Sequence, residues 1–432
     1  MLKRAGKHAA VLVGLLWFVA PAAGQFRQYS SPGTLRQPLE DLKTSLDTAI
    51  EEARWDLGAI RVEPVFGLGD VIYVTDVFQD EEGQLQSDWT ASVEAGFEAF
   101  LPAGQKTILY AQAVPRYTWW NKQSERRQLN GTYSAEAYGF FNRLTWELGL
   151  GLQQQLQFAT PEVEQLTTVR NEQAVAGFEL GLGRSFYWFN DWRLRKTRYN
   201  EGEPDDAGIA PFSRNDRDDE ILRSGIRLRT RDDVSVGIGV ALTDSEFQDP
   251  TFDRSNSGTS PFVEADYQRD DWFLYGEVYF LDLEPENESD FVAFSGVGGE
   301  LGASWSPNRV RYSFYYRRDL TYSLSEIYSY FTQDRYGIRV DFEVSRLATL
   351  GGFLETGVDD YETIDVLALP REDDFNGWGL TLSMQLWERV DFDVGFRERD
   401  YESTIDQFDR SSTQIRVGLT LSVFGGRIGI RG

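Results

Sequence analysis

The feature that most constrains this chain is a strict two-residue alternation of apolar and polar side chains near its C-terminus. A first run, which begins near Leu380, carries Asp391, Asp393 and Arg397 on a single face. A second run places apolar side chains at every other position: Ile415, Val417, Leu419, Leu421 and Val423. A period of two is that of a β-strand whose faces differ. Because a soluble core seldom contains such a charged row, the pattern predicts that the apolar face meets lipid and the charged face meets water, as in a transmembrane β-barrel.

The composition agrees with a strand-rich protein. The chain has 432 residues, of which 14% are aromatic, with 40 glycines and 14 prolines, and no apolar run of about 18 residues follows the N-terminal region. A helical membrane protein is therefore excluded. The net charge of −26 would repel nucleic acid, so no nucleic-acid partner is expected. The chain contains no cysteine, which excludes disulfides and thiolate chemistry.

The N-terminus has the features of a secretory signal. Residues 1–24 combine a basic start, an apolar stretch and a small-residue cleavage site before Gln25. Removal of Lys3, Arg4 and Lys7 would change the formal charge from −26 to −29. The one histidine, His8, would be lost with this segment, so the mature protein would contain none.

Residues 25–58 are expected to form a periplasmic segment with one amphipathic helix, because Leu39, Leu42, Leu46 and Ala53 recur at helical spacing. Two interpretations stay open for this helix. It is either packed at the barrel mouth, or it is a plug or docking handle for a periplasmic partner.

Residues 59–432 are predicted to form the barrel itself. Very short connections such as Ser345-Arg346 alternate with long polar ones such as Asp70–Ser87 and Thr160–Asn171. This alternation is typical of periplasmic turns and outer loops. It predicts an all-β, antiparallel transmembrane barrel of about 18 strands, with 16 as the alternative.

Aromatic side chains gather near the ends of the predicted strands. Such residues form girdles at the two membrane interfaces of known barrels. The candidates for these girdles are Trp89, Tyr117, Trp119, Trp120, Trp188, Trp192, Trp272, Trp305, Trp378 and Trp387.

If the apolar faces meet lipid, arginines point into the barrel. The predicted lumen-lining cations are Arg193, Arg195, Arg223, Arg227, Arg229, Arg311, Arg317, Arg335, Arg339, Arg397, Arg399 and Arg416, joined by the acids Glu147, Glu179, Asp391 and Asp393. One interpretation is structural, with cross-strand ion pairs to Glu94, Glu98, Glu136, Glu179, Glu277 and Glu300 that stiffen the wall. The other is that the arginines guide an anionic or hydroxyl-rich solute.

Catalysis is not expected. Because the mature protein would contain no histidine, it would lack the side chain that usually activates a nucleophile or a water molecule. Carboxylates two residues apart, such as Asp391 and Asp393, fit a charge ladder better than an acid–base pair. No cofactor and no specific metal site are predicted.

Two stretches carry a resemblance to a known family. The opening Arg61–Gly69 and the strand end Arg397–Tyr401 resemble the β-barrel porins found with exopolysaccharide and capsule export genes, of the β-barrel porin 2 type. The resemblance implies an outer-membrane protein of a Gram-negative bacterium. It would lie among outer-membrane lipid and lipopolysaccharide, and its further partners would be polysaccharide and periplasmic export proteins. The first hypothesis is therefore a porin that passes polysaccharide or other polar solutes. The alternative is a closed barrel that scaffolds export partners or binds surface ligands.

Overall fold

We analysed a computed structural model of the chain. It describes residues 42–79, 85–124, 127–160, 162–200, 211–230, 233–249, 252–325, 327–364, 369–387 and 390–424. The predicted signal segment 1–24 and the part of the predicted helix before Leu42 lie outside these residues.

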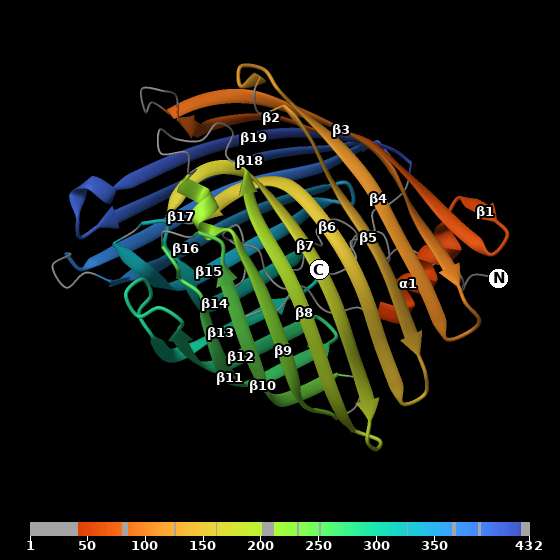
Figure 1. Cartoon of the computed structure of the whole chain (residues 1–432). Coiled ribbons are helices and arrows are strands. Elements are labelled where there is room, and N and C mark those ends of the chain that lie inside the picture. The colour runs from red at the N-terminus through yellow and green to blue at the C-terminus, as the bar shows by residue number, and fades with distance from the viewer. Residues whose placement is uncertain are drawn as a thin grey trace.

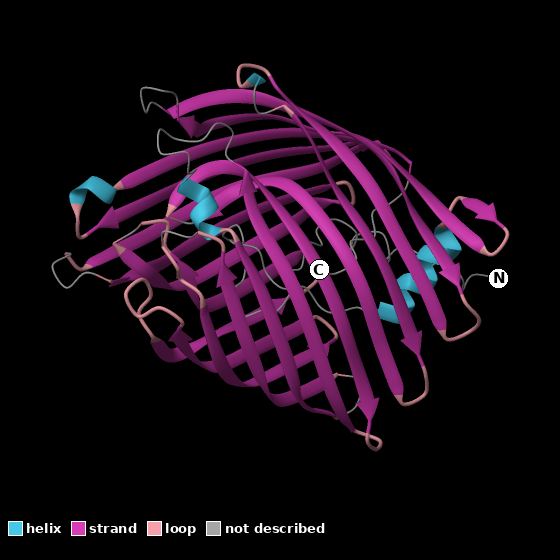
Figure 2. Ribbon diagram, in the orientation of Figure 1, coloured by secondary structure: helices cyan, strands magenta, loops and turns pink. Residues whose placement is uncertain are grey.

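The described chain is one antiparallel sheet that closes on itself (Figures 1 and 2). Each strand pairs with the next along the chain, and the last long strand pairs with the first. The strands are β1 (Trp55–Leu57), β2 (Ile60–Gln79), β3 (Leu85–Pro102), β4 (Thr107–Trp120), β5 (Gln128–Phe140), β6 (Leu144–Thr160), β7 (Val163–Gly181), β8 (Phe186–Asn200), β9 (Arg217–Arg229), β10 (Val234–Phe247), β11 (Asn256–Arg269), β12 (Trp272–Pro285), β13 (Phe294–Trp305), β14 (Val310–Tyr322), β15 (Tyr328–Ser345), β16 (Ala348–Thr363), β17 (Arg371–Trp387), β18 (Val390–Ser403) and β19 (Arg410–Phe424). The helical elements are α1 (Leu42–Glu52) and the short turns η2 (Pro211–Asn215) and η3 (Asp406–Phe408).

The predicted fold class is confirmed. The long strands run from β2 to β19, which is the predicted eighteen, and the three-residue β1 is an addition that sequence patterns missed. β1 pairs with the start of β2, where Trp55 faces Val62 and Leu57 faces Ile60.

The two faces of the wall differ as the alternation predicted. Large apolar side chains such as Leu150, Ile238, Leu354 and Leu380 are exposed on the outside of the barrel. On β9, Ile226 is exposed outward, so Arg223 and Arg227 point inward. A closed sheet has no free edge, and its apolar outer face is suited to lipid.

Inward-facing rings lie flat on glycines of neighbouring strands. Gly302 is directly opposite Tyr275, and Gly337 is opposite Tyr315. A Cβ at Gly302 would lie 2.2 Å from the Tyr275 ring, and one at Gly337 would lie 2.1 Å from the Tyr315 ring. These glycines therefore leave room for rings that lie along the wall and do not project into the interior.

Two of the long loops predicted at one end of the barrel are largely strand. The predicted loop Thr160–Asn171 is a tight turn, because β6 ends at Thr160 and β7 begins at Val163. Likewise β2 continues to Gln79 and β3 begins at Leu85, inside the predicted loop Asp70–Ser87. We call this the loop end of the barrel, and the opposite end, with its short connections, the turn end.

Helix α1 packs on the inner wall at the turn end. Leu46 and Ala49 are buried among Phe100, Ile108 and Tyr138 on β3, β4 and β5. No helix in the described chain is both long and apolar enough to cross a membrane.

Candidate channel lumen

A strip of arginines on β9 faces the interior and is paired with carboxylates. The Arg227 guanidinium donates to Glu179 at 2.9 Å and to Glu264 on β11 at 2.9 Å. Arg229 also pairs with Glu179, at 2.7 Å. Arg223 completes the strip, with its guanidinium 3.2 Å from Glu277 on β12. The charges therefore form a connected network across β7, β9, β11 and β12.

The same arginines lie on aromatic rings. The guanidinium of Arg223 is 4.3 Å from the centre of the Phe262 ring, that of Arg227 is 4.7 Å from Phe189, and that of Arg229 is 4.6 Å from Tyr187. A cation over a ring face is stabilised electrostatically. Ring and carboxylate together fix each guanidinium on the wall.

The remaining predicted arginines also lie on the inner face, with varied surroundings. Four are ion-paired, among them Arg193 with Asp191 at 2.8 Å, Arg195 with Asp219 at 3.0 Å and Arg339 with Asp341 at 2.7 Å. Arg335 pairs with Asp359 at 2.8 Å and stacks on Phe375, and Arg397 lies over Phe353. Arg317 donates a hydrogen bond to Gln333, and Arg311 donates one to Ser306. Of the last two, the side chain of Arg399 is buried and that of Arg416 is exposed.

The predicted acids take several roles. Glu94 pairs with Arg116 at 2.7 Å, and Glu179 and Glu277 pair with the arginine strip. Glu98, Glu136 and Glu300 instead accept hydrogen bonds from Gln112, Tyr138 and Tyr275. Glu147 lies against Gly177, and Asp391 and Asp393 are half-buried on β18. Ion pairs thus support the structural interpretation of the charges at Glu94, Glu179 and Glu277.

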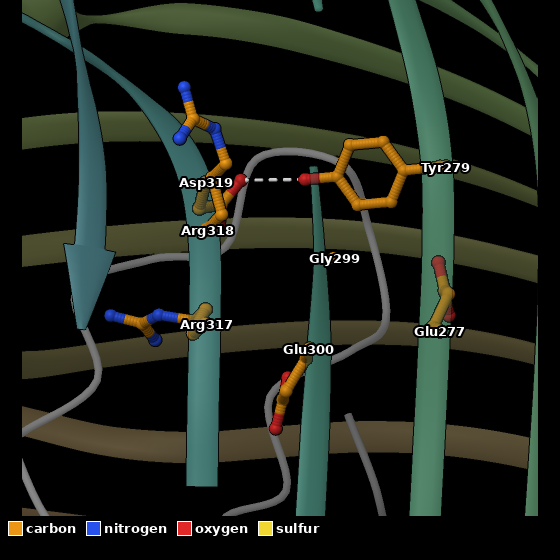
Figure 3. Close-up of a pocket in the computed structure, with 7 residues that line it drawn as sticks. All are labelled: Glu277, Tyr279, Gly299, Glu300, Arg317, Arg318 and Asp319. Carbon is orange, nitrogen blue, oxygen red and sulfur yellow. Dashed lines mark hydrogen bonds between the residues drawn. The ribbon is translucent and has the colours of Figure 1, made fainter. Parts of the chain in front are cut away.

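A niche opens on the inner wall where β12, β13 and β14 meet (Figure 3). Its volume is about 10 Å³, enough for one water molecule. Glu277, Glu300 and Arg317 line it, and the Tyr279 hydroxyl donates to Asp319 at 3.1 Å (Figure 3). The niche is charged but too small to enclose a solute, so it can only contact a solute that passes along the wall.

The loop end of the barrel is partly packed. Phe291, from the β12–β13 connection, is buried against side chains that include Leu283, Leu320 and Tyr330. The buried Arg254 guanidinium donates to the carbonyl of Arg214 and to that of Ser323, and it stacks on Phe247. Burial lowers the pKa of Arg254 to about 10, so it stays charged at neutral pH. This packing narrows the passage at one side.

The predicted girdle aromatics are exposed on the outer face, with one exception. Trp188, Trp272, Trp305 and Trp387 lie toward the turn end, and Trp89, Tyr117, Trp119 and Trp378 lie toward the loop end. Trp120 is 1% exposed and faces inward, so its prediction is wrong; it directly follows the outward-facing Trp119 in the strand. Trp192, whose indole donates to Glu220, also lies on the outer face.

The spacing of these girdles fits a membrane. On β17, Trp378 and Trp387 are nine residues apart, which at about 3.3 Å per residue is ~30 Å along the strand. With the usual tilt of about 40°, this corresponds to roughly 23 Å across the barrel wall, close to the apolar band of outer-membrane barrels.

Sequence patterns missed one constellation at the loop end. Glu162, in the β6–β7 turn, is bonded to Ser323, Leu324 and Arg371 on the far side of the barrel. Neither alternation nor spacing relates positions so distant in the chain.

With this geometry in place, the barrel can be compared with solved structures. OccK3 (OpdO) of Pseudomonas aeruginosa matches with a TM-score of 0.51 and 11% identity, covering 89% of this chain and 100% of that one. OccK2 (OpdF) of the same organism gives 0.52 and 10% identity, with 84% and 98% covered. A BenF-like porin from Pseudomonas fluorescens Pf-5 gives 0.50 and 8%, with 84% and 99% covered.

The chain has the porin barrel fold. At these identities the likeness establishes the architecture alone. No family model matches the sequence, and no curated protein matches it significantly. The family of exopolysaccharide-associated porins is therefore not shown, and function must be argued from the porin barrel itself.

Proposed function

We propose that this protein is an outer-membrane channel of a Gram-negative bacterium that passes small polar solutes. The observation that carries the proposal is the wall itself: a closed barrel with an apolar outer band between two aromatic girdles and an inner face of ion-paired charge. An apolar band placed outside and charge placed inside is the arrangement of water-filled membrane barrels.

The solute class follows from the interior. Paired arginines and carboxylates give a polar surface that favours hydrated or hydroxylated solutes without holding them tightly. A solved structure of a similar barrel, OccK2 (OpdF), is described in complex with glucuronate. The packed side of the loop end argues for small solutes over polymers. Polysaccharide passage therefore rests on the sequence resemblance alone.

A channel is favoured over an enzyme. The described residues contain no group of three or more His, Cys, Asp or Glu side chains placed to hold a metal ion. The carboxylates of the inner wall are instead engaged with arginines, amides or phenols, as expected of a charged lining.

The test is conductance of the purified protein in planar bilayers. Wild type should insert in discrete steps and show a measurable ion selectivity. Replacing the inward Arg317 by Gln removes one lumenal cation and should shift the reversal potential in a salt gradient toward cation selectivity. Arg170, which lies on the outer face of β7 and pairs with Glu172 at 2.6 Å, is the matched control, and Arg170→Gln should leave selectivity unchanged.

Absence of conductance would contradict the proposal. If both wild type and a variant lacking residues 25–53 inserted without conducting, the barrel would be closed. The alternative function, a scaffold for periplasmic export partners or a binder of surface ligands, would then be favoured, because α1 and the packed loop end already occupy part of the interior.

A further inference from the structure

The β6–β7 hairpin crosses the interior of the barrel at the loop end. In the sheet order, β6 lies half-way around the barrel from β15. Nevertheless Glu162, at the turn of the hairpin, contacts Ser323 and Leu324 before β15, and Arg371 at the start of β17. β7 also approaches β2, several strands away from it. The hairpin must therefore bend inward over the opening, as the arched ends of β6 and β7 indicate (Figure 1).

The seat that receives Glu162 is built for a carboxylate. The Ser323 hydroxyl donates to it at 3.0 Å, the Leu324 backbone N–H at 2.7 Å and the Arg371 guanidinium at 3.2 Å. The Glu162 side chain is 6% exposed and that of Arg371 is 1% exposed, so the contact is shielded from solvent. These three donors satisfy the hydrogen-bonding capacity of the buried carboxyl group.

The seat does not depend on Glu162 for its own order. Arg371 pairs with Asp373 at 2.6 Å, and its guanidinium lies 4.0 Å from the centre of the Tyr361 ring and 3.8 Å from that of Phe408. Asp373 is held in addition by Arg410, at 3.1 Å. Removal of the Glu162 carboxylate therefore leaves the opposite wall intact and frees only the hairpin.

We propose that the β6–β7 hairpin is a strap across the loop-end mouth, latched on the opposite wall by Glu162, and that unlatching it widens the passage. The polar contacts that the described chain makes between the hairpin turn and this wall all run through Glu162. Glu162 is thus the polar anchor of the hairpin turn on this wall, and the approach of β7 to β2 supports the hairpin further along its length. This inference rests on the proposed channel function for its conductance readout, but the crossing itself is tested without it.

The crossing is tested by a chemical bridge. Because the chain has no cysteine, the double variant Glu162→Cys with Ser323→Cys introduces a single thiol pair. A short bis-methanethiosulfonate reagent should link the pair in the folded barrel in detergent, as detected by mass spectrometry of the digest. The control pairs Ser323→Cys with Glu172→Cys, because Glu172 lies on β7 and bonds to Arg170 on the outer face. No bridge in the first pair, or equal bridging in both, overturns the crossing.

The latch is tested by single-channel recording. Glu162→Ala removes the acceptor that the hairpin offers to the seat, so the fraction of time spent in a higher-conductance level should rise by about tenfold, as expected for loss of a hydrogen-bonded anchor. Glu162→Gln keeps an acceptor oxygen for Ser323 and Leu324 and should stay near wild type. Glu172→Gln is the matched control on the same hairpin. Bridging the two introduced thiols should hold the low level until a reductant is added.

The outcomes separate the two proposals. If wild type and all variants fail to conduct but the bridge forms, the crossing stands, the channel function fails and the gating role falls with it. If wild type conducts and Glu162→Ala behaves like wild type, the hairpin is a fixed brace and the latch is refuted.

Discussion

At the scale of single residues, the loop end concentrates buried charge outside the membrane-spanning strands. Burial raises the pKa of Glu162, and the Leu324 N–H, Arg371 and Ser323 only partly offset this effect. Arg410, Arg254 and Asp373 are the other charged groups around this site, with Tyr328 and Tyr361 nearby. Ionisation of Glu162 therefore costs more free energy in this buried position than it would in water.

The sign of the pH dependence follows from this raised pKa. An unlatched Glu162 would have the ordinary pKa of a glutamate, so the latched state binds a proton more readily than the unlatched one. The latch is strongest below the ordinary glutamate range and weakens as pH rises through the higher pKa of the latched state. We expect the open fraction to increase with pH in single-channel records, and Glu162→Gln to be insensitive to pH over the same range. A wild-type channel that opens on acidification would contradict this assignment.

The sequence predicted on which face of the wall each charged residue lies, but it did not predict the residue's partners. Alternation alone placed Arg223 and Arg227 inward, because a strand fixes the side on which each residue lies. It did not identify Glu264 as the partner of Arg227, which depends on how β9, β10 and β11 curve together. The bond from Arg371 to Glu162 spans 209 residues and has no local signal at all.

At the scale of elements, the strands extend beyond the membrane, and this explains the error in loop length. The start of β17, Arg371–Asp374, is polar on both faces yet remains hydrogen-bonded to β16 and β18. Above the girdle, the outer face meets water, so apolar residues are no longer required there. The two-residue alternation fades, and a strand then has the composition of a loop.

Helix α1 gives a prediction at this same scale. Leu46 is fully buried against the inner wall, so Leu46→Ala should weaken docking of the helix by about 3 kcal/mol. The helix should then be cleaved faster by protease in detergent, and the turn end should conduct more because its interior is less filled. Thr48, exposed on the same helix, is the control, and Thr48→Ala should change neither reading. Equal cleavage of the two variants would show that α1 is held by contacts other than Leu46.

At the scale of the whole molecule, the barrel depends on the closure between its first and last strands. The described ladder between β19 and β2 joins Leu421 to Leu68, Ser422 to Gly67 and Phe424 to Phe66, with an irregularity before the last pair. By contrast, the β16–β17 ladder is continuous from Ala348 to Tyr361. β1 covers the part of the β2 edge near Ile60. The two closing strands nevertheless lie alongside each other as closely as other neighbouring strands do, so the closure differs from the rest by this irregularity and by the added N-terminal strand.

This closure should be where the barrel opens first. Amides in an interrupted ladder are released by smaller local openings than those inside a continuous one. In hydrogen exchange followed by mass spectrometry, peptides from β19 should exchange about tenfold faster than those from β16, equivalent to ~1.4 kcal/mol in opening free energy. Asp56→Pro, which places a proline in the middle of β1, should accelerate exchange at the start of β2 and leave β16 unchanged, because proline cannot donate to the ladder. Uniform exchange across β16 and β19 would mean that the closing strands are joined as firmly as the rest, and that the barrel unfolds without a preferred seam.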